Sequence, residues 1–368
     1  MKRIIACLLF LLSFIAQAQE EKPTKYFSLD ASYFYGTILE HNPDIAHLIT
    51  DHPEGFLLSW NRKTYGLEKW ERRYNYPDFG YSFIYQNMKN TYLGENYSLY
   101  GHFSFYALKR LLMFRIGQGV AYTTNPYDPD ENYINNAYGT RFLSSTYLMG
   151  NIQKENIIGG LGINAGVTII HYSNADLGSP NHSTNTFTFN VGVNYLLDYE
   201  EHPDTFIPRE PKEKYTEPFH YNFAVRSGIN TAGVVGSPRL PFLTISAYAD
   251  KVLNRKSTLH GGAELFFSRS LEEFIEYQSV AFPQKGTTGD EDAKRVGLFV
   301  GHKLTFNKMS LITHLGYYVY YPYTDYVDQV YNRMGLQREI TDHWWASATV
   351  RSHGANAEAV EFSIGYRL

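Results

Sequence analysis

The feature that most constrains the fold is an alternation of apolar and polar residues in steps of two, which is the period of a β-strand. Between residues 186 and 197 the odd positions are apolar, from Phe187 to Leu197, whereas most even positions are Thr, Asn or Gly. The last residues repeat the pattern, with apolar positions running from Val360 to Leu368. A soluble β-sandwich alternates in the same way. The pattern therefore predicts strands with one apolar face and leaves the architecture open.

Composition excludes several classes of protein. The chain has 368 residues, of which 43% are hydrophobic and 16% aromatic, and a mean hydropathy of −0.35. The hydrophobic content is too high for a disordered chain. No window approaches the roughly 18 apolar residues of a membrane-spanning helix, which excludes a polytopic helical membrane protein. The net charge of −4 gives no support for a nucleic-acid partner.

The first 18 residues have the features of a secretory signal peptide. Lys2 and Arg3 form a basic region, residues 4–15 an apolar stretch, and Ala16-Gln17-Ala18 a small-residue cleavage site. We expect residues 1–18 to be removed, leaving 19–368 as the mature domain. Because the one cysteine of the chain, Cys7, lies in this segment, the prediction excludes disulfides and thiol catalysis in the mature protein.

The export signal, the aromatic excess and the apolar strand at the C-terminus together predict a transmembrane antiparallel β-barrel in the outer membrane of a Gram-negative-type bacterium. We count about sixteen strands, with fourteen as an alternative. The charged, proline-containing segment 200–218 could be a loop of one barrel or a linker between two eight-stranded halves. We favour one continuous barrel, because the second half shows no signature of an independent unit.

Three polar residues share the outward parity of two adjacent predicted strands. His171 and Ser173 continue the apolar positions 161–169, and Asn185 shares the parity of Phe187. Residues i and i+2 of a strand lie roughly 6–7 Å apart on one face. A histidine can therefore activate the serine, while an asparagine carbonyl holds the imidazole tautomer. Ordinary polar residues at a barrel rim would show the same pattern.

The stretch around these residues resembles a known family. The shared core is His171-Tyr172-Ser173-Asn174, then Pro180-Asn181 and the position of Asn185, with supporting stretches at 70–77 and 135–139. This part of the chain, about residues 55–200, resembles the outer-membrane lipid A deacylases, the acyloxyacyl hydrolase-like barrels. The resemblance implies a membrane-embedded ester hydrolase that needs no metal or other cofactor and whose partner is lipid A or lipopolysaccharide of the outer leaflet.

The resemblance also implies a role for each residue. Ser173 is the nucleophile, His171 the base and Asn174 the oxyanion donor, with Asn181 beside the substrate. Asn185 occupies the position at which the best-known deacylases have a glutamate, twelve residues after the serine. Asp176 stands where the family prefers glycine.

Two further functions are compatible with the sequence. Outer-membrane phospholipase A uses a similar His-x-Ser with an asparagine twelve residues later, which the spacing of Ser173 and Asn185 matches. A non-catalytic barrel is the third possibility, either a pore or a structural subunit among other outer-membrane proteins. The predicted size supports it, since about sixteen strands can enclose a lumen.

The acidic loop 125–132 contains Asp128, Asp130 and Glu131. It lacks the ligand spacing and the central glycine of an EF-hand loop. We therefore interpret it as a solvated loop and predict no metal site there.

Overall fold

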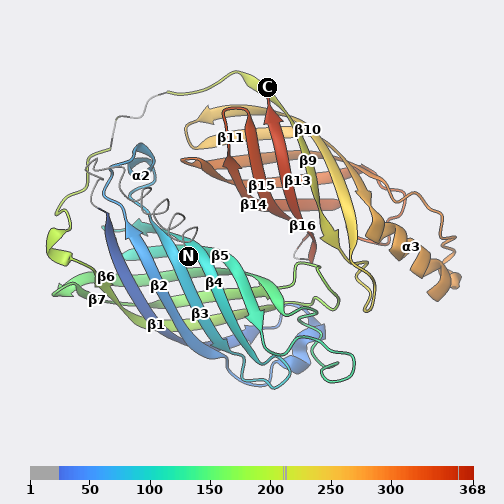
Figure 1. Ribbon diagram of the computed structural model, residues 1–368, viewed down its shortest axis with the longest axis horizontal. Coiled ribbons are helices and arrows are strands. Elements are labelled where there is room, and N and C mark those ends of the chain that lie inside the picture. Colours follow the sequence, from blue (N-terminus) through green and yellow to red (C-terminus); the bar gives the residue numbers. More distant parts are fainter. Residues whose placement is uncertain (1–24, 210, 212–213, 355) are drawn as a thin grey trace, which may run out of the picture.

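The computed structural model describes residues 25–209, 211, 214–354 and 356–368. The predicted signal peptide, residues 1–18, lies outside this range. Sixteen strands form two closed antiparallel barrels of eight strands each (Figure 1). Among the described residues, no helix is long and apolar enough to cross a membrane.

The first barrel is built from β1 (Tyr26–Leu39), β2 (Glu54–Lys63), β3 (Asp78–Asn87), β4 (Glu95–Ala107), β5 (Leu112–Thr123), β6 (Phe142–Ile158), β7 (Leu161–Ser173) and β8 (Thr184–Leu196). The second is built from β9 (Phe219–Asn230), β10 (Leu240–Asn254), β11 (Ser257–Ser268), β12 (Arg295–Phe306), β13 (Met309–Tyr320), β14 (Val330–Glu339), β15 (Trp344–His353) and β16 (Asn356–Arg367). The short helices are η1 (Pro43–Leu48), α2 (Lys69–Arg73), η2 (Tyr199–Glu201), α3 (Arg269–Ala281) and η3 (Pro283–Lys285).

The strand count of sixteen is confirmed, but the favoured single barrel is wrong and the alternative of two eight-stranded halves is correct. β8 pairs with β1, for example Phe189 with Tyr35, and β16 pairs with β9, for example Ile364 with Val225. Each half thus closes on itself and leaves no unpaired edge for the other half to extend. The segment 200–218 is the connection between the two barrels.

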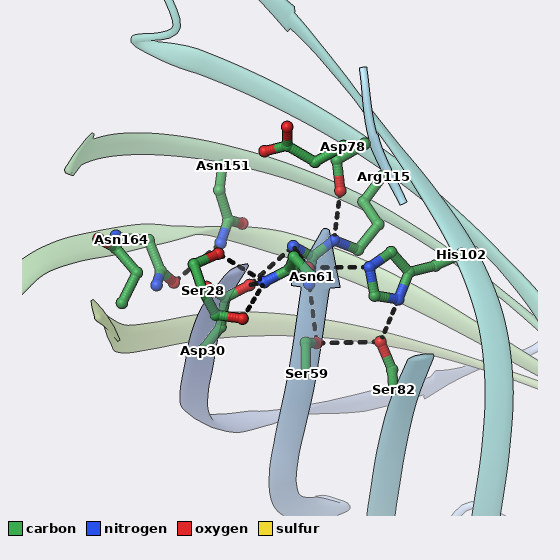
Figure 2. A network of polar contacts seen from close by, with 12 residues as sticks. Ser28, Asp30, Ser59, Asn61, Asp78, Ser82, His102, Arg115, Asn151 and Asn164 are labelled. Atoms are coloured by element: carbon green, nitrogen blue, oxygen red, sulfur yellow. Dashed lines mark hydrogen bonds and ion pairs between the residues drawn. The ribbon is translucent and has the colours of Figure 1, made fainter. Parts of the chain in front are cut away.

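The alternation places apolar residues outside both barrels and most of the polar residues inside, where they pack with buried apolar and aromatic side chains such as Ile84 and Tyr147. In the first barrel the interior network is centred on Asn61 and Arg115 (Figure 2). The Arg115 guanidinium donates to Asp30 at 2.7 Å and to Ser59 at 2.8 Å, and Asn61 accepts from His102 at 2.9 Å. The remaining groups of this network are mostly neutral hydroxyls and amides.

The interior of the second barrel contains a cluster of ion pairs that packs against buried aromatic side chains such as Tyr331. The guanidinium of Arg333 lies 2.8 Å from Glu264, and it also contacts Glu361. Arg295 pairs with Glu358 at 2.6 Å. These side chains are essentially inaccessible to solvent. Within the described residues no sixteen-stranded ring forms, so the lumen on which the pore interpretation rested is not formed.

The two barrels contact each other at both ends. At one end, the Tyr74 hydroxyl donates to the Thr305 carbonyl at 2.7 Å, and Phe306 packs against Phe103 with ring centroids 5.8 Å apart. At the other end, Thr231, just after β9, bonds to Asp176, just after β7. The second contact lies beside the residues that the sequence singles out.

Candidate functional site

The β7–β8 hairpin brings His171 and Asn185 together. They are direct partners in the ladder between the two strands, and His171 Nδ1 lies 2.8 Å from Asn185 Oδ1. His171 has the same parity as Ile163 and Val167, whose side chains are exposed on the outside of the barrel. When the Asn185 carbonyl accepts from Nδ1–H, the other ring nitrogen, Nε2, is free to accept a proton.

Ser173 ends β7 and is covered by the loop that follows. Its side chain is 6% exposed, and it lies opposite Ser144 of β6. The hydroxyl donates to Asn181 Oδ1 at 3.0 Å, and its oxygen accepts the backbone N–H of Ala175 at 3.0 Å. The structure thus joins Ser173 with Asn181 and His171 with Asn185 as two neighbouring pairs.

Asn174 holds the loop in shape. Its side-chain amide donates to the carbonyls of Gly178 at 2.5 Å and Pro180 at 3.1 Å, and its backbone N–H donates to Asn181 Oδ1 at 3.0 Å. The side chain is fully buried. In this conformation the amide stabilises the loop, and its role as an oxyanion donor stays a prediction.

The chain reverses directly after Asn174 through two residues with left-handed backbone. Ala175 has φ +52° and Asp176 has φ +62°. Glycine adopts this conformation without a steric cost, and aspartate is among the residues that tolerate it best. This explains how Asp176 can stand at a position where glycine is the expected residue.

Asp176 is bonded to the second barrel. The Thr231 backbone N–H donates to the Asp176 carbonyl at 3.2 Å, and the Thr231 hydroxyl donates to Asp176 Oδ1 at 3.1 Å. Ser179 Oγ lies 3.2 Å from the same hydroxyl. Burial raises the pKa of Asp176 to about 8. The hydrogen bond from Thr231 lowers this pKa, and the nearby charge of Glu358 raises it. The sequence did not predict a role for Thr231. The one local indication was the aspartate at position 176, where glycine is expected, because this aspartate is the partner of Thr231.

The two supporting stretches of the resemblance lie at different places. The stretch 135–139 packs on the loop: the Asn136 carbonyl accepts the His182 N–H at 3.2 Å. A Cβ on Gly139 would lie 2.6 Å from the Pro180 carbonyl oxygen, so only glycine fits this contact. The stretch 70–77 lies instead at the opposite end, where Tyr74 meets the second barrel.

Within the described residues, the seventh strand of the second barrel has no outward histidine at its end. The last two outward residues of β15 are Val350 and Ser352, where β7 has His171 and Ser173. A serine without a neighbouring base is a poor nucleophile. The candidate site is therefore confined to the first barrel, with contacts from the second.

Fold and site together define a class: a double antiparallel β-barrel with a histidine, a serine and an asparagine on the outside of one barrel. Residues 54–194 match the family model of lipid A 3-O-deacylase (PagL), and residues 219–368 match that of the acyloxyacyl hydrolase C-terminal domain. The first match covers the first barrel from β2 onward, and the second covers the whole second barrel. The chain belongs to the PagL-like family.

Comparisons with individual proteins add little. No curated protein sequence matches the chain. Among solved structures, a mutant porin of Rh. blastica covers 94% of this chain and 100% of its own at 10% identity, with a TM-score of 0.19. A triple mutant of the Rhodopseudomonas blastica porin gives 8% identity over the same shares and a TM-score of 0.20. Scores this low carry no argument about this chain.

Proposed function

We propose that the protein is an outer-membrane ester hydrolase that removes an acyl chain from lipid A, with Ser173 as nucleophile and His171 as base. The observation that carries the proposal is the 2.8 Å contact between His171 Nδ1 and Asn185 Oδ1 on the outside of the barrel. A histidine with a structural role would be expected inside the barrel, where His102 lies, and not on its outer face. The family match supports the substrate class, because residues 54–194 align with a lipid A deacylase model.

The proposed reaction proceeds through an acyl-serine. The Ser173 hydroxyl turns from Asn181 to His171, and its proton passes to Nε2 while Oγ bonds to the ester carbonyl carbon. The sugar hydroxyl leaves with the proton that His171 returns. A water molecule then attacks the acyl-serine and gives one proton to His171. The fatty acid departs as Ser173 Oγ takes that proton back.

Backbone N–H groups at the turn are candidates for stabilising the tetrahedral oxygen. The Ala175 N–H lies 3.0 Å from Ser173 Oγ, and that of Asn174 points to Asn181. Both N–H groups can donate to the substrate oxygen once the Ser173 hydroxyl and the Asn181 side chain have moved away from them. A donor aimed at the developing oxyanion contributes roughly 3–4 kcal/mol to catalysis.

The outward position suits a substrate that stays in the membrane. Next to the site the barrel exposes large apolar side chains such as Ile169, Val167 and Leu148. Polar groups among such residues are costly in a lipid environment, which favours a functional reason for them. A lipid of the outer leaflet can approach His171 from the side without leaving the bilayer, and it reaches Ser173 when the loop that covers the serine moves.

A phospholipase A activity is the second candidate, and the neutral amide at 185 is the observation that favours it. Asn185 orients His171 without supplying a negative charge. Outer-membrane phospholipase A, whose His-x-Ser spacing this chain resembles, has an asparagine at the same distance from the serine. Both candidates share one nucleophile and differ in the head group of the substrate.

One experiment separates these candidates. The purified protein in detergent is given lipid A or a defined diacyl phospholipid, and released fatty acid is measured by mass spectrometry. We expect release from lipid A and its loss by at least about 10³-fold in Ser173→Ala. Ser352→Ala, which removes the corresponding serine of the second barrel, is the matched control and should retain full activity. Equal activity of the two variants would refute serine catalysis, and release from phospholipid alone would favour the second candidate.

A further inference from the structure

A cleft lies between the barrels at the end that carries the candidate site. Its volume is about 810 Å³, and both barrels contribute to its walls. The first barrel supplies the loop after β5, the start of β6 and Leu177, and the second supplies Ile229 and Arg239.

The cleft begins next to the proposed nucleophile. Ser173 pairs with Ser144, and Phe142 is the next outward residue of β6 toward the cleft. On the other side, the Leu177 N–H donates to the Asn174 carbonyl at 3.1 Å. The cleft therefore begins two residues along β6 from Ser144, the ladder partner of Ser173.

The walls of the cleft are amphipathic. Phe142 is 70% exposed and Ile229 is 44% exposed, one on each barrel, and both belong to the outer surfaces. The cleft is also lined by two exposed guanidinium groups, Arg141 and Arg239, again one from each barrel, and by the carboxylates of Asp128 and Glu131 on the first barrel. Apolar side chains beside guanidinium groups match an amphiphile whose head group is anionic.

The two arginines differ in their surroundings. Arg141 donates to the Thr124 carbonyl at 3.2 Å, and its charge contributes to the lowered pKa of Asp128, after the hydrogen bonds from the backbone of Glu131 and Asp130. Part of the Arg141 charge is thus balanced within the first barrel. Arg239 extends from the segment between β9 and β10 and brings a cation to the cleft from the second barrel.

We propose that this cleft binds the phosphorylated head group of the glycolipid substrate, with Arg239 contacting a phosphate. The proposal rests on the function proposed above and assigns a part of substrate recognition to the second barrel. Guanidinium groups bind phosphate through paired, charge-assisted hydrogen bonds, which a lysine does not reproduce. Hydroxyls and amides of Thr91, Asn125 and Asn132 are available in the cleft for the sugar.

The test uses the full-length protein and the variants Arg239→Gln and Arg239→Lys. Arg269→Gln is the control, because Arg269 is also exposed on the second barrel but does not line the cleft. Initial rates are measured on lipid A, on lipid A from which the phosphates have been removed, and on a short uncharged ester. We expect Arg239→Gln to raise KM roughly 10-fold to 100-fold for the phosphorylated substrate alone, with kcat unchanged. Arg239→Lys should recover only part of the loss.

Binding is measured separately so that it does not depend on turnover. In a Ser173→Ala background, fluorescence titration with phosphorylated lipid A should show the same loss of affinity on adding Arg239→Gln. Unchanged affinity in that background overturns the proposal, and so does an equal loss for dephosphorylated lipid A. If Ser173→Ala alone leaves hydrolysis intact, the proposed function fails while the binding result still decides the role of the cleft.

Discussion

The two barrels have the same closure and different interiors. In the first barrel, the polar interior is a network of hydroxyls and amides around the pair of Arg115 with Asp30, together with a second charged group in which Lys63 pairs with Asp78 and Glu155. In the second, four fully buried arginines pair with glutamates, among them Arg333 with Glu264. Closure by eight strands therefore places no demand on which polar groups fill the interior. The difference suggests that the second barrel is the more dependent on each of its charges.

The outer surfaces of the two barrels also differ, in the residues at the end of the seventh strand of each. The end of β7 presents His171 and Ser173, whereas the end of β15 presents Val350 and Ser352. The second barrel instead contributes Thr231 to the loop beside the serine and Arg239 to the adjacent cleft. One barrel thus holds the candidate chemistry and the other supports it from outside.

The largest effect is expected from breaking an interior ion pair. Arg333→Met leaves Glu264 and Glu361 without their main partner, which should lower the free energy of unfolding by about 3–5 kcal/mol. In the first barrel, Ser59→Ala removes a neutral hydroxyl that bonds to Arg115 and Ser82, and this should cost about 1–3 kcal/mol.

Urea unfolding of the refolded protein in detergent measures both changes. Trp60 and Trp70 report on the first barrel and Trp344 and Trp345 on the second, so single-tryptophan versions resolve the two transitions. An equal cost of the two substitutions would contradict the contrast between the interiors.

A smaller effect is expected from the contact between the barrels. Thr231→Val retains the backbone bond to Asp176 and loses the hydroxyl that binds Asp176 and Ser179. Because this contact positions the loop over Ser173, kcat on lipid A should fall roughly 3-fold to 10-fold with KM unchanged. Thr231→Ser should restore it. A variant with normal kcat would show that the second barrel has no influence on the loop.

The smallest effect concerns pH. The pKa of Asp176 is raised to about 8, from the ordinary value of 3.8, so the native loop holds a proton that the unfolded chain releases. The stabilisation by this proton is complete below pH 3.8 and is lost as the pH rises through about 8. The ionised carboxylate would then lie near Glu358, beside a pocket that also contains Asp325, Asp328 and His353.

Activity on lipid A should therefore fall above pH 8, by roughly 3-fold to 4-fold at pH 8.5. Asp176→Asn, which cannot ionise, should show no such decline. The comparison is made from rates between pH 6.5 and 9 on the wild type and the variant. Identical profiles would contradict the assignment of the decline to Asp176.

The alternation of apolar and polar residues predicts most of the local structure from the sequence alone. Parity alone assigns His171, Ser173 and Asn185 to one face of a hairpin, because side chains of a strand must alternate. The pairing of His171 with Asn185 follows from that hairpin, and the count of sixteen strands follows from the segments. These are local properties, and each depends on residues close together in the chain.

Closure and the contacts between the barrels are decided only in three dimensions. A backbone ladder between β8 and β1 uses the same hydrogen bonds as any other ladder, so no side chain marks Phe189 as the partner of Tyr35. Thr231 meets Asp176 across 55 residues of sequence because both barrels close and then dock at one end. Such contacts depend on the shape of two finished surfaces, which no local pattern of residues contains.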